Sequence, residues 1–265
     1  MLRNGNSPTI HIRNDRQRSI LEYLDQQHKV KVTELSKQFN VTDETIRRDL
    51  ETLEQNNLLI RVHGGAMKPQ QEGFELPMME REEKNFKEKE MIAQEAAAMI
   101  EEGDIIALDA STTCTHLAKA LTHETLTVIT NSISVTAELA NKSPHIQVIL
   151  TGGYLRRESM SLVGFSSDKI IDDYHINKFF LSCSAVDTSW GLSESHEMQT
   201  NTKKRMSQIS DRLILLADNS KFQRKSLVHL LPLNRIDTII TDHKLDPEAA
   251  ALFKKQVNNF KLASE

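Results

Sequence analysis

Apolar residues near the start of the chain recur at helical spacing along three short segments. In the third segment, 41–53, the sequence V-T-D-E-T-I-R-R-D-L-E-T-L places Ile46, Leu50 and Leu53 on one helix face. The opposite face carries only polar side chains, which are Glu44, Arg48, Glu51 and Gln55. Thr42 is a good N-cap, and the acidic residues after it suit the positive end of the helix dipole. The pattern predicts an amphipathic helix with a polar face available to another molecule.

Two further helices are predicted upstream, over 16–27 and 32–39. Their inward apolar residues are Ile20, Leu21 and Leu24 in the first, and Leu35 and Phe39 in the second. Asn40 follows, and asparagine tolerates the left-handed conformation that closes a helix. A helix, a tight turn and a helix that starts in short polar residues form the geometry that inserts a helix into the DNA major groove. The alternative is an ordinary helical hairpin, but a hairpin has no need of paired arginines beside hydroxyl residues on its outward face.

A short basic hairpin is predicted after the third helix. In segment 58–67, Arg61 and His63 alternate with apolar residues, and Gly64-Gly65 supplies a turn. Three helices and such a wing make a winged helix-turn-helix. The side chains expected to contact DNA are Thr42, Glu44, Thr45, Arg47, Arg48, Arg61 and His63.

From Gly103 onward, short apolar runs alternate with helical segments. The runs are 105–108, 126–129, 146–150, 179–182, 213–217 and 238–240. Near-continuous apolar runs suit strands buried on both faces, as in a parallel sheet between helix layers. The alternation predicts an α/β domain.

Polar residues follow five of these strands, in segments 109–113, 130–132, 151–153, 184–187 and 218–221. Ligands of open parallel sheets bind at the carboxyl ends of the strands. Ser111, Thr112 and Thr113 lie where a strand turns into a helix, which suits a phosphate. We expect Gly152 and Gly153 to allow close backbone approach, Asn131 and Ser132 to bind sugar hydroxyls, and Lys221, with Arg156 and Lys203, to balance the charge.

Composition sets broad limits. The 265 residues suffice for two domains, and 38% apolar and 26% charged residues are ordinary for a globular protein. No apolar run approaches the roughly 20 residues that span a bilayer, and the amino-terminal stretch shows no export signal, so we expect a cytoplasmic protein. Cys114 and Cys183 are too few for a disulfide framework or metal site, and both are expected to be buried thiols.

Charge is unevenly distributed. Residues 1–68 hold 11 basic and 9 acidic residues, a net charge of +2, which leaves 22 basic and 28 acidic residues, a net of −6, in the remainder. Phosphate contacts supply much of DNA affinity, so only the first part suits DNA. Its charge is modest, and we therefore expect a homodimer or homotetramer that reads repeated half-sites.

The expected organisation is a disordered tail over 1–12, a DNA-binding domain over 13–68, a linker over 69–85 and an effector-sensing and oligomerisation domain over 86–265. The Pro- and Gly-containing stretch 68–80 suggests the linker. No cofactor, metal site or membrane association is expected.

Several motifs together resemble those of the DeoR-type bacterial transcription regulators. They include V-T-x-L-S-x-x-F, T-I-R-R-D-L and R-x-H-G-G-A in the first part, and E-K-x-x-I-A, D-x-x-T-T, T-N-S, T-G-G, A-x-D, G-L-S and D-x-S-K-F in the second. The resemblance implies a helix-turn-helix unit over 30–49. It also implies a sensor domain that resembles phosphosugar isomerases such as ribose-5-phosphate isomerase and binds a phosphorylated sugar or related metabolite.

Two positions depart from the family pattern. Ala110-Ser111 replace Ser-Gly in the phosphate loop, and Gln199 replaces a carboxylate that Glu197 could supply. The expected effector-binding residues are Asp109, Ser111, Thr112, Thr113, Asn131, Ser132, Gly152, Gly153, Asp187, Glu197, Lys203 and Lys221.

The function expected first is a DNA-binding repressor of carbohydrate genes controlled by a phosphorylated sugar. An alternative is a phosphosugar isomerase with an accessory DNA-binding domain, for which Asp109, Asp187 and Glu197 are candidate acids or bases. No paired carboxylates are apparent, so no catalytic residue is assigned. A third possibility is that the acidic domain only oligomerises. The sequence does not name the sugar, the operator or the direction of regulation.

Overall fold

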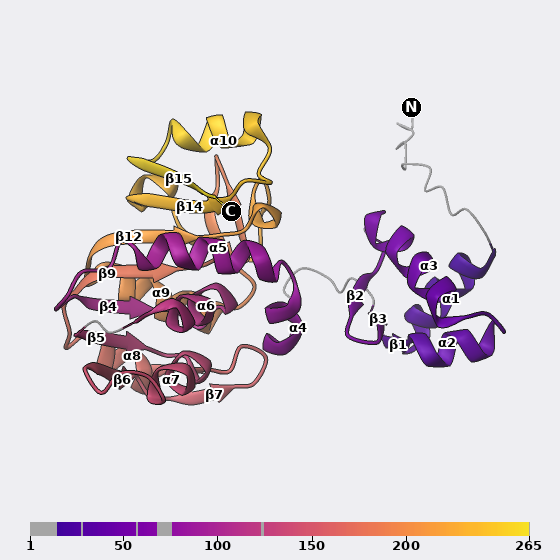
Figure 1. Cartoon of the computed structure of the whole chain (residues 1–265), viewed down its shortest axis with the longest axis horizontal. Coiled ribbons are helices and arrows are strands. Elements are labelled where there is room, and N and C mark those ends of the chain that lie inside the picture. Colours follow the sequence, from indigo (N-terminus) through magenta and orange to yellow (C-terminus); the bar gives the residue numbers. More distant parts are fainter. Residues whose placement is uncertain (1–14, 28, 57, 68–75, 123–124, 265) are drawn as a thin grey trace, which may run out of the picture. The chain divides into compact units, whose positions relative to one another are not determined.

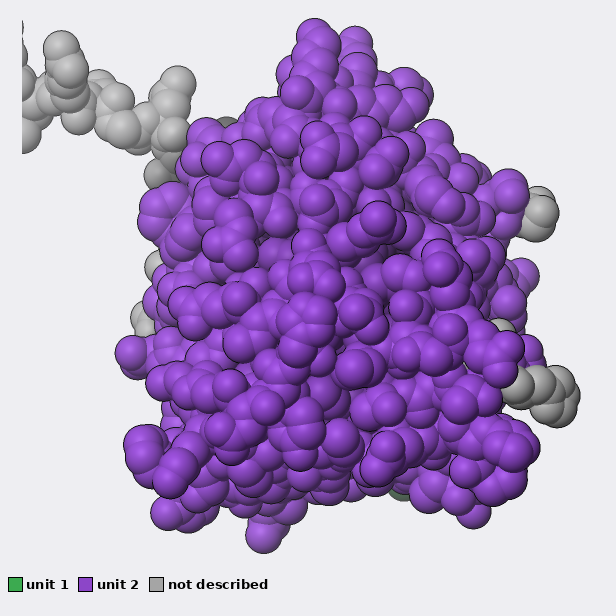
Figure 2. Space-filling view, turned by 90° about the vertical axis from the view of Figure 1, so that its left-hand side faces the viewer, with its two compact units in different colours: residues 1–71 green, residues 72–265 purple. Residues whose placement is uncertain are grey.

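The structure is a computed structural model that describes residues 15–27, 29–56, 58–67, 76–122 and 125–264 (Figure 1). The chain divides into two compact units, residues 1–71 and 72–265. Figure 2 shows one face of the second unit, in purple. The tail expected over 1–12 lies outside the described residues.

The first unit is a small helical domain with a three-stranded sheet. Its elements are α1 (Asp15–Gln27), β1 (Lys29–Lys31), α2 (Val32–Gln38), α3 (Asp43–Gln55), β2 (Ile60–Val62) and β3 (Gly65–Met67). Ile20, Ile46 and Leu50 are at most 1% exposed and lie in one core with the other predicted inward residues. Asn40 has a φ of 51°, as expected for the turn between α2 and α3. The predicted winged helix-turn-helix is confirmed.

The wing contains one strand that the apolar pattern did not reveal. The sheet order is β1-β3-β2, and β1 pairs antiparallel with β3. Val30 is the only buried residue of β1 and lies between two exposed lysines, so the strand is too short for a periodic signal. Gly65 allows the close approach of these strands, because a Cβ there would lie 1.9 Å from Val30 O.

The second unit is built on a seven-stranded sheet in which every neighbouring pair is parallel. From one edge to the other the order is β15 (Asn259–Ala263), β14 (Thr238–Asp242), β12 (Ser210–Leu216), β9 (Ile176–Leu181), β4 (Ile105–Leu108), β5 (Leu126–Thr130) and β6 (Ile146–Leu150). The predicted parallel sheet and its six strands are therefore confirmed, and β15 is added.

Helices cover both faces of this sheet (Figure 1). One layer is α5 (Phe86–Ala97), α6 (Thr112–Ala120) and α7 (Ile133–Ala140), and the other is α8 (Phe165–Ile171), α9 (Glu197–Gln208) and α10 (Pro247–Lys254). Phe179 belongs to the core under the second layer, and Phe180 to the core under the first. Successive residues of a strand point to opposite faces, so an apolar run fills both cores.

Two small antiparallel elements were not predicted. A hairpin comprises β7 (Tyr154–Arg156) and β8 (Ser161–Val163), and a second sheet has the order β10 (Ala185–Asp187), β11 (Gly191–Glu194) and β13 (Val228–Leu231). Short 3-10 helices occur at η1 (Asn219–Lys221) and η2 (Leu233–Arg235). The hairpin and η1 both lie near the carboxyl edge of the main sheet, since their residues hydrogen bond to residues that end β5 and β12.

The linker expected over 69–85 lies partly outside the described residues. Its second half contains helix α4 (Met78–Glu83), whose Met78 is 4% exposed. Residues 78–83 therefore pack as part of the second unit, in contrast to our expectation. None of the helices within the described ranges is long and apolar enough to cross a membrane.

Candidate DNA interface and effector site

Helix α3 presents a charged, exposed face. The side chains of Arg47 and Arg48 are 58% and 78% exposed, and Glu44 lies 3.8 and 3.6 Å from them. These ion pairs are exposed and therefore weak. Glu44 can orient the two arginines, and both remain accessible to a binding partner. Thr42 caps the helix by accepting from Thr45 N at 3.3 Å, and the two hydroxyls lie 2.9 Å apart. The predicted contact residues of α3 therefore share one solvent-facing end.

The wing carries the other two predicted contact residues. Arg61 lies on β2 with its side chain 42% exposed, 4.0 Å from Glu51 and 3.8 Å from Glu54 of α3. Arg61 N also donates to Glu54 Oε1 at 3.0 Å, which fixes the strand against the helix. His63 lies exposed in the turn before β3. The wing and α3 are thus joined on their polar sides.

Asp49 is a positioning residue that the sequence interpretation missed. It is 5% exposed, it pairs with Arg16 of α1, and its Oδ1 accepts from Gln17 Nε2 at 3.1 Å. A buried carboxylate is stable when it is paired and hydrogen bonded. The aspartate of T-I-R-R-D-L therefore ties α3 to α1. Asp49 directly precedes the buried Leu50 in α3, and this position could have indicated from the sequence that its side chain is buried.

The second unit has a topological switch point between β4 and β9. The chain leaves β4 toward β5 and β6 on one side, and β9 begins the other half of the sheet. Asp109 follows β4, and its Oδ2 accepts from Ser182 N, which follows β9, at 2.8 Å. Crevices at such points are where α/β sheets bind ligands. The predicted carboxyl-edge residues therefore converge on a suitable place.

Lys203 lies at the switch point, but it is fully engaged by the protein. Its Nζ lies 2.7 Å from Asp109 Oδ2 and 2.5 Å from Glu194 Oε1, and it donates to Ser182 O at 2.8 Å. Burial alone would lower the pKa of Lys203, but the two carboxylates raise it. An ammonium has three donors, so no hydrogen remains for a ligand. This differs from our expectation that Lys203 and Asp109 contact the ligand, because here they bind each other. Glu194, which we did not predict, is the third member of this buried cluster.

The turn over residues 111–113, where we expect a phosphate to bind, is more covered than the sequence suggested. Ser111, Thr112 and Thr113 are 8%, 5% and 3% exposed. Ser111 caps α6 by accepting from Cys114 N at 3.1 Å, and α4 and α5 pack against α6. The first N–H groups of a helix have no partner within it, so α6 directs its positive end into this covered turn.

The β7–β8 hairpin covers the end of β5. Asn131 Nδ2 donates to Leu162 O at 3.0 Å, and Ser132 caps α7 by accepting from Val135 N. Gly153 has a φ of 113° and packs so closely that a Cβ would lie 2.7 Å from Val163 O. Gly152 has a φ of 71° and faces Ile170. Asn131, Ser132 and Gly153 therefore contact the hairpin, whereas Gly152 faces α8, and both glycines keep part of their surface exposed.

The remaining predicted carboxylates lie apart from the cluster. Asp187 closes the β10–β11 turn by accepting from Ser189 N and Trp190 N, and its pKa is lowered by hydrogen bonds from Ser189 first. Glu197 is exposed in the first turn of α9. Gln199 is 4% exposed and its Oε1 accepts from Ser161 Oγ at 3.0 Å. Besides Asp109, the carboxylate that pairs with Lys203 is therefore Glu194 and not Glu197.

Lys221 is a partly buried cation at the same edge, on η1. No ion pair joins it to a carboxylate of the described residues, although it is close enough to Asp218 to affect that group. Burial would raise the pKa of Asp218, but Lys221 and hydrogen bonds from Ser220 and Asn85 lower it overall. Lys221 is therefore the predicted cation that is best placed for an anionic ligand.

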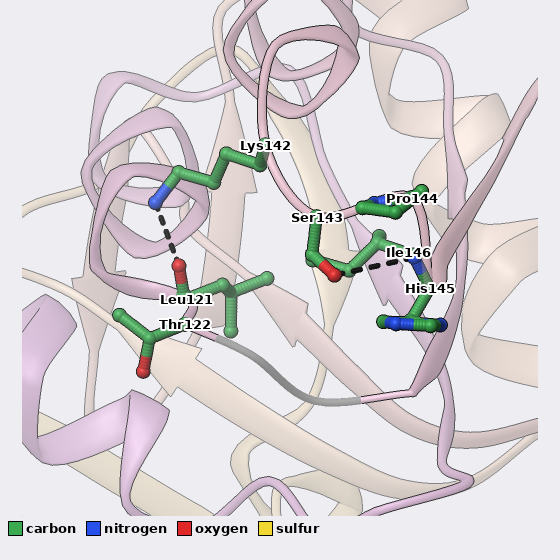
Figure 3. A pocket seen from close by; sticks show the side chains of 7 residues that line it. All are labelled: Leu121, Thr122, Lys142, Ser143, Pro144, His145 and Ile146. Carbon is green, nitrogen blue, oxygen red and sulfur yellow. Dashed lines mark hydrogen bonds between the residues drawn. The ribbon is translucent and has the colours of Figure 1, made fainter.

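Two hollows lie at the opposite, amino edge of the sheet. One, of about 540 Å³, lies between the end of α6 and the start of β6, where Lys142 Nζ donates to Leu121 O at 2.6 Å (Figure 3). The other, of about 400 Å³, includes Lys178, which pairs with Asp104 at 2.7 Å. Lys142 and Lys178 therefore already have protein partners, whereas Arg212, which also lines the second hollow, is exposed. No cluster of three potential metal ligands occurs within the described residues.

Comparison with known proteins identifies both parts of the chain. Residues 16–72 match the family described as DeoR-like helix-turn-helix domain, and residues 84–243 match the DeoR C terminal sensor domain. The chain belongs to the DeoR family of transcriptional regulators. It joins a DNA-binding domain to a sensor domain, as the sequence motifs predicted.

Curated relatives extend over nearly the whole chain. The HTH-type transcriptional regulator YulB of Bacillus subtilis is 46% identical over 244 residues, 92% of this chain and 94% of the relative. The L-fucose operon activator of Haemophilus influenzae is 36% identical, over 88% and 93% of the two chains. The glycerol-3-phosphate regulon repressor of Escherichia coli is 32% identical, over 86% and 90%.

A similar solved structure is ribose 5-phosphate isomerase A from Methanocaldococcus jannaschii. It is 17% identical with a TM-score of 0.39, over 52% of this chain and 55% of the isomerase.

Proposed function

We propose that this DeoR-family regulator represses carbohydrate genes and that a phosphorylated sugar at the carboxyl edge of the sensor sheet controls it. The main support is the carboxyl edge of the sheet near the switch point between β4 and β9. There the amino end of α6 and Lys221, which has no ion-paired carboxylate among the described residues, supply positive potential beside a buried polar cluster. A helix amino end and a lysine suit a phosphate. Two relatives, named as the glycerol-3-phosphate regulon repressor and a putative aga operon transcriptional repressor, support repression of this kind.

We propose a regulatory and not a catalytic role for the site. Asp109 is held by Lys203 and Ser182, and Asp187 is engaged in a turn, so neither carboxylate is free to transfer protons. We propose that the protein acts in the cytoplasm as a homodimer or homotetramer, with residues 13–68 on DNA and 86–265 sensing and oligomerising. The net charge of +2 in residues 1–68 favours several DNA-binding domains per operator.

The DNA-binding role is tested by replacing Arg48 with alanine. The operator probe is the DNA between this gene and its neighbours, and fluorescence anisotropy at fixed salt measures affinity. Loss of one base contact predicts about tenfold weaker binding. Arg157→Ala, an exposed change in the sensor domain, is the control. Equal affinity of Arg48→Ala and wild type would reject the role of this face.

The effector role is tested by thermal shift across pentose, hexose and triose phosphates, with isomerase assays on the same compounds. We expect stabilisation by at least one compound without turnover. Turnover would favour the isomerase alternative. Lack of stabilisation by every sugar phosphate would favour an oligomerisation domain without a sensor.

A further inference from the structure

Large apolar side chains are exposed on and beside helix α8. Phe165, the first residue of the helix, is 79% exposed, and Ile170 near its end is 37% exposed. Tyr174 follows in the next turn and is also 37% exposed. Tyr154 of β7 is 75% exposed and adjoins the start of α8, because a Cβ at Gly164 would lie 3.0 Å from its ring. We call these four side chains, Tyr154, Phe165, Ile170 and Tyr174, the α8 face. Exposed apolar patches mark sites of interaction.

The α8 face lies toward the β6 edge of the main sheet (Figure 1). Gly152, which follows β6, faces Ile170. Strand β6 pairs only with β5 among the described strands, and residues 146–155 contain no charged side chain. The other edge strand, β15, carries Lys261, which lies 2.8 Å from Glu95 of α5. Charges on an edge strand oppose association with another chain, so the β6 side is the edge that favours it.

Two oppositely charged side chains accompany the apolar residues. Lys169 and Asp173 are both exposed and lie four residues apart, but neither forms an ion pair with any residue that the structure describes. The neighbouring carboxylates of Asp168 and Asp172 both pair with Arg205 of α9, at 3.7 and 2.5 Å. The α8 face is therefore flanked by one unpaired charge of each sign.

Such a surface is complementary to a second copy of itself. In a two-fold dimer the same patch of both subunits meets, so each contact between two different residues occurs twice. Two antiparallel copies of α8, related by an axis near Ile170, bring Lys169 of each copy within reach of Asp173 of the other. The same axis brings Phe165 of each copy toward Tyr174 of the other. A second copy thus covers the apolar side chains and pairs both charges.

We propose that the α8 face is the surface through which two copies of this chain associate. This inference rests on the oligomer proposed above and names the surface that joins the sensor domains. The contact is isologous and closes a dimer, so a tetramer uses a second, different surface as well. Aromatic side chains at the centre of an interface supply much of its binding energy, and here they are Phe165 and Tyr154. The dimer supplies the two DNA-binding domains that the modest charge of residues 1–68 calls for.

The mass of the full chain without DNA, measured by sedimentation equilibrium, tests the inference. Phe165→Asp places a charge in the α8 face, and we expect at least tenfold weaker association. The mass should fall from dimer to monomer, or from tetramer to dimer. Leu252→Asp, a change at a 48% exposed leucine of α10, is the matched control and should assemble like the wild type. Phe165→Ser is used if Phe165→Asp does not fold. Unchanged mass in the Phe165 variants, or an equal loss in the control, would overturn the inference.

Exchange of the two charges identifies the partner as a second copy. Lys169→Glu and Asp173→Lys each place like charges opposite one another in a homodimer, so we expect about tenfold weaker association of each at low salt. An equimolar mixture should assemble nearly like the wild type, because both contacts of the mixed dimer are attractive again. A mixture that assembles no better than its components would overturn the inference alone. A wild-type chain that is monomeric at every concentration would also overturn the proposed oligomer, whereas the Arg48→Ala test of DNA binding would stand apart from it.

Discussion

At the scale of single residues, this protein contains two buried lysines with opposite electrostatic surroundings. Lys203 lies between the carboxylates of Asp109 and Glu194, which raise its pKa, whereas carbonyl oxygens surround Lys89 and burial lowers its pKa to about 8. The first arrangement is internally compensated and rigid. In the second, the desolvation caused by burial outweighs the nearby charge of Asp218, which raises the pKa.

Replacement of Lys203 by methionine is expected to destabilise the sensor domain strongly. It leaves Asp109 and Glu194 buried without their cation, and breaking such a pair costs about 3–5 kcal/mol. Urea unfolding measures the loss of unfolding free energy. Lys204→Met changes a half-exposed neighbour and should have little effect. Equal losses in the two variants would contradict a supporting role for Lys203.

Lys89 predicts a dependence of stability on pH. Its pKa is about 8 in the folded protein against an ordinary 10.5. Between these values the unfolded chain binds more protons at this position, so the unfolding free energy rises with pH. Wild type should therefore gain stability relative to Lys89→Met as the pH increases from about 8 toward 10.5. Urea unfolding across this range measures the difference, and a difference independent of pH would show that Lys89 titrates normally.

At the scale of elements, short segments without internal stability carry the connections between larger ones. The wing depends on β1, three residues long, and the path from the linker depends on α4, six residues long. Both are held by a few specific contacts, through Gly65 in the wing and through Met78, Glu82 and Lys89 at α4. Such elements can change position at low cost.

Alanine substitutions at the two glycines of the wing, Gly64 and Gly65, are expected to destabilise the DNA-binding domain to different extents. Gly65→Ala would place a Cβ 1.9 Å from Val30 O, so we expect a loss of about 3 kcal/mol in the DNA-binding domain. Gly64→Ala meets no atom within 4 Å but has a φ of 73°, so backbone strain of about 1 kcal/mol is expected. Thermal unfolding and operator anisotropy measure both. The reverse order of severity would argue against the β1–β3 packing.

At the scale of the whole molecule, charge separates the tasks of the two units. The net charge is +2 over residues 1–68 and −6 over the remainder. A net negative charge disfavours contact with DNA phosphates, so we expect the second unit to contribute to operator binding only through the proposed oligomer.

The number of domains bound can be read from the salt dependence of affinity. Each phosphate contact changes the slope of log affinity against log salt by about 0.9. If Arg61 contacts a phosphate, Arg61→Ala should reduce the slope by about 1 for one bound domain and about 2 for a dimer. Sedimentation equilibrium without DNA provides the independent measure of assembly. A monomer in solution with a slope change of about 1 would contradict the proposed oligomer.

The sequence alone determined the elements that repeat a strong pattern. Ile46, Leu50 and Leu53 fixed the buried side of α3, and uninterrupted apolar runs located the strands of the parallel sheet, because burial of apolar surface forces both patterns. The polar residues after each strand were likewise predicted to share one edge, since parallel strands end together. The sequence motifs likewise predicted the family to which the chain belongs.

Only the tertiary structure decided how those polar residues are used. Whether a lysine faces a ligand or a carboxylate depends on distant residues. Glu194 contacts Lys203 from β11, whose G-L-S motif does not indicate this partner. The same holds for Asp49 with Arg16 and for Lys89 with the end of α4. Local pattern specifies which surface is buried, whereas partners of buried charges are set by long-range packing, which spacing along the chain does not encode.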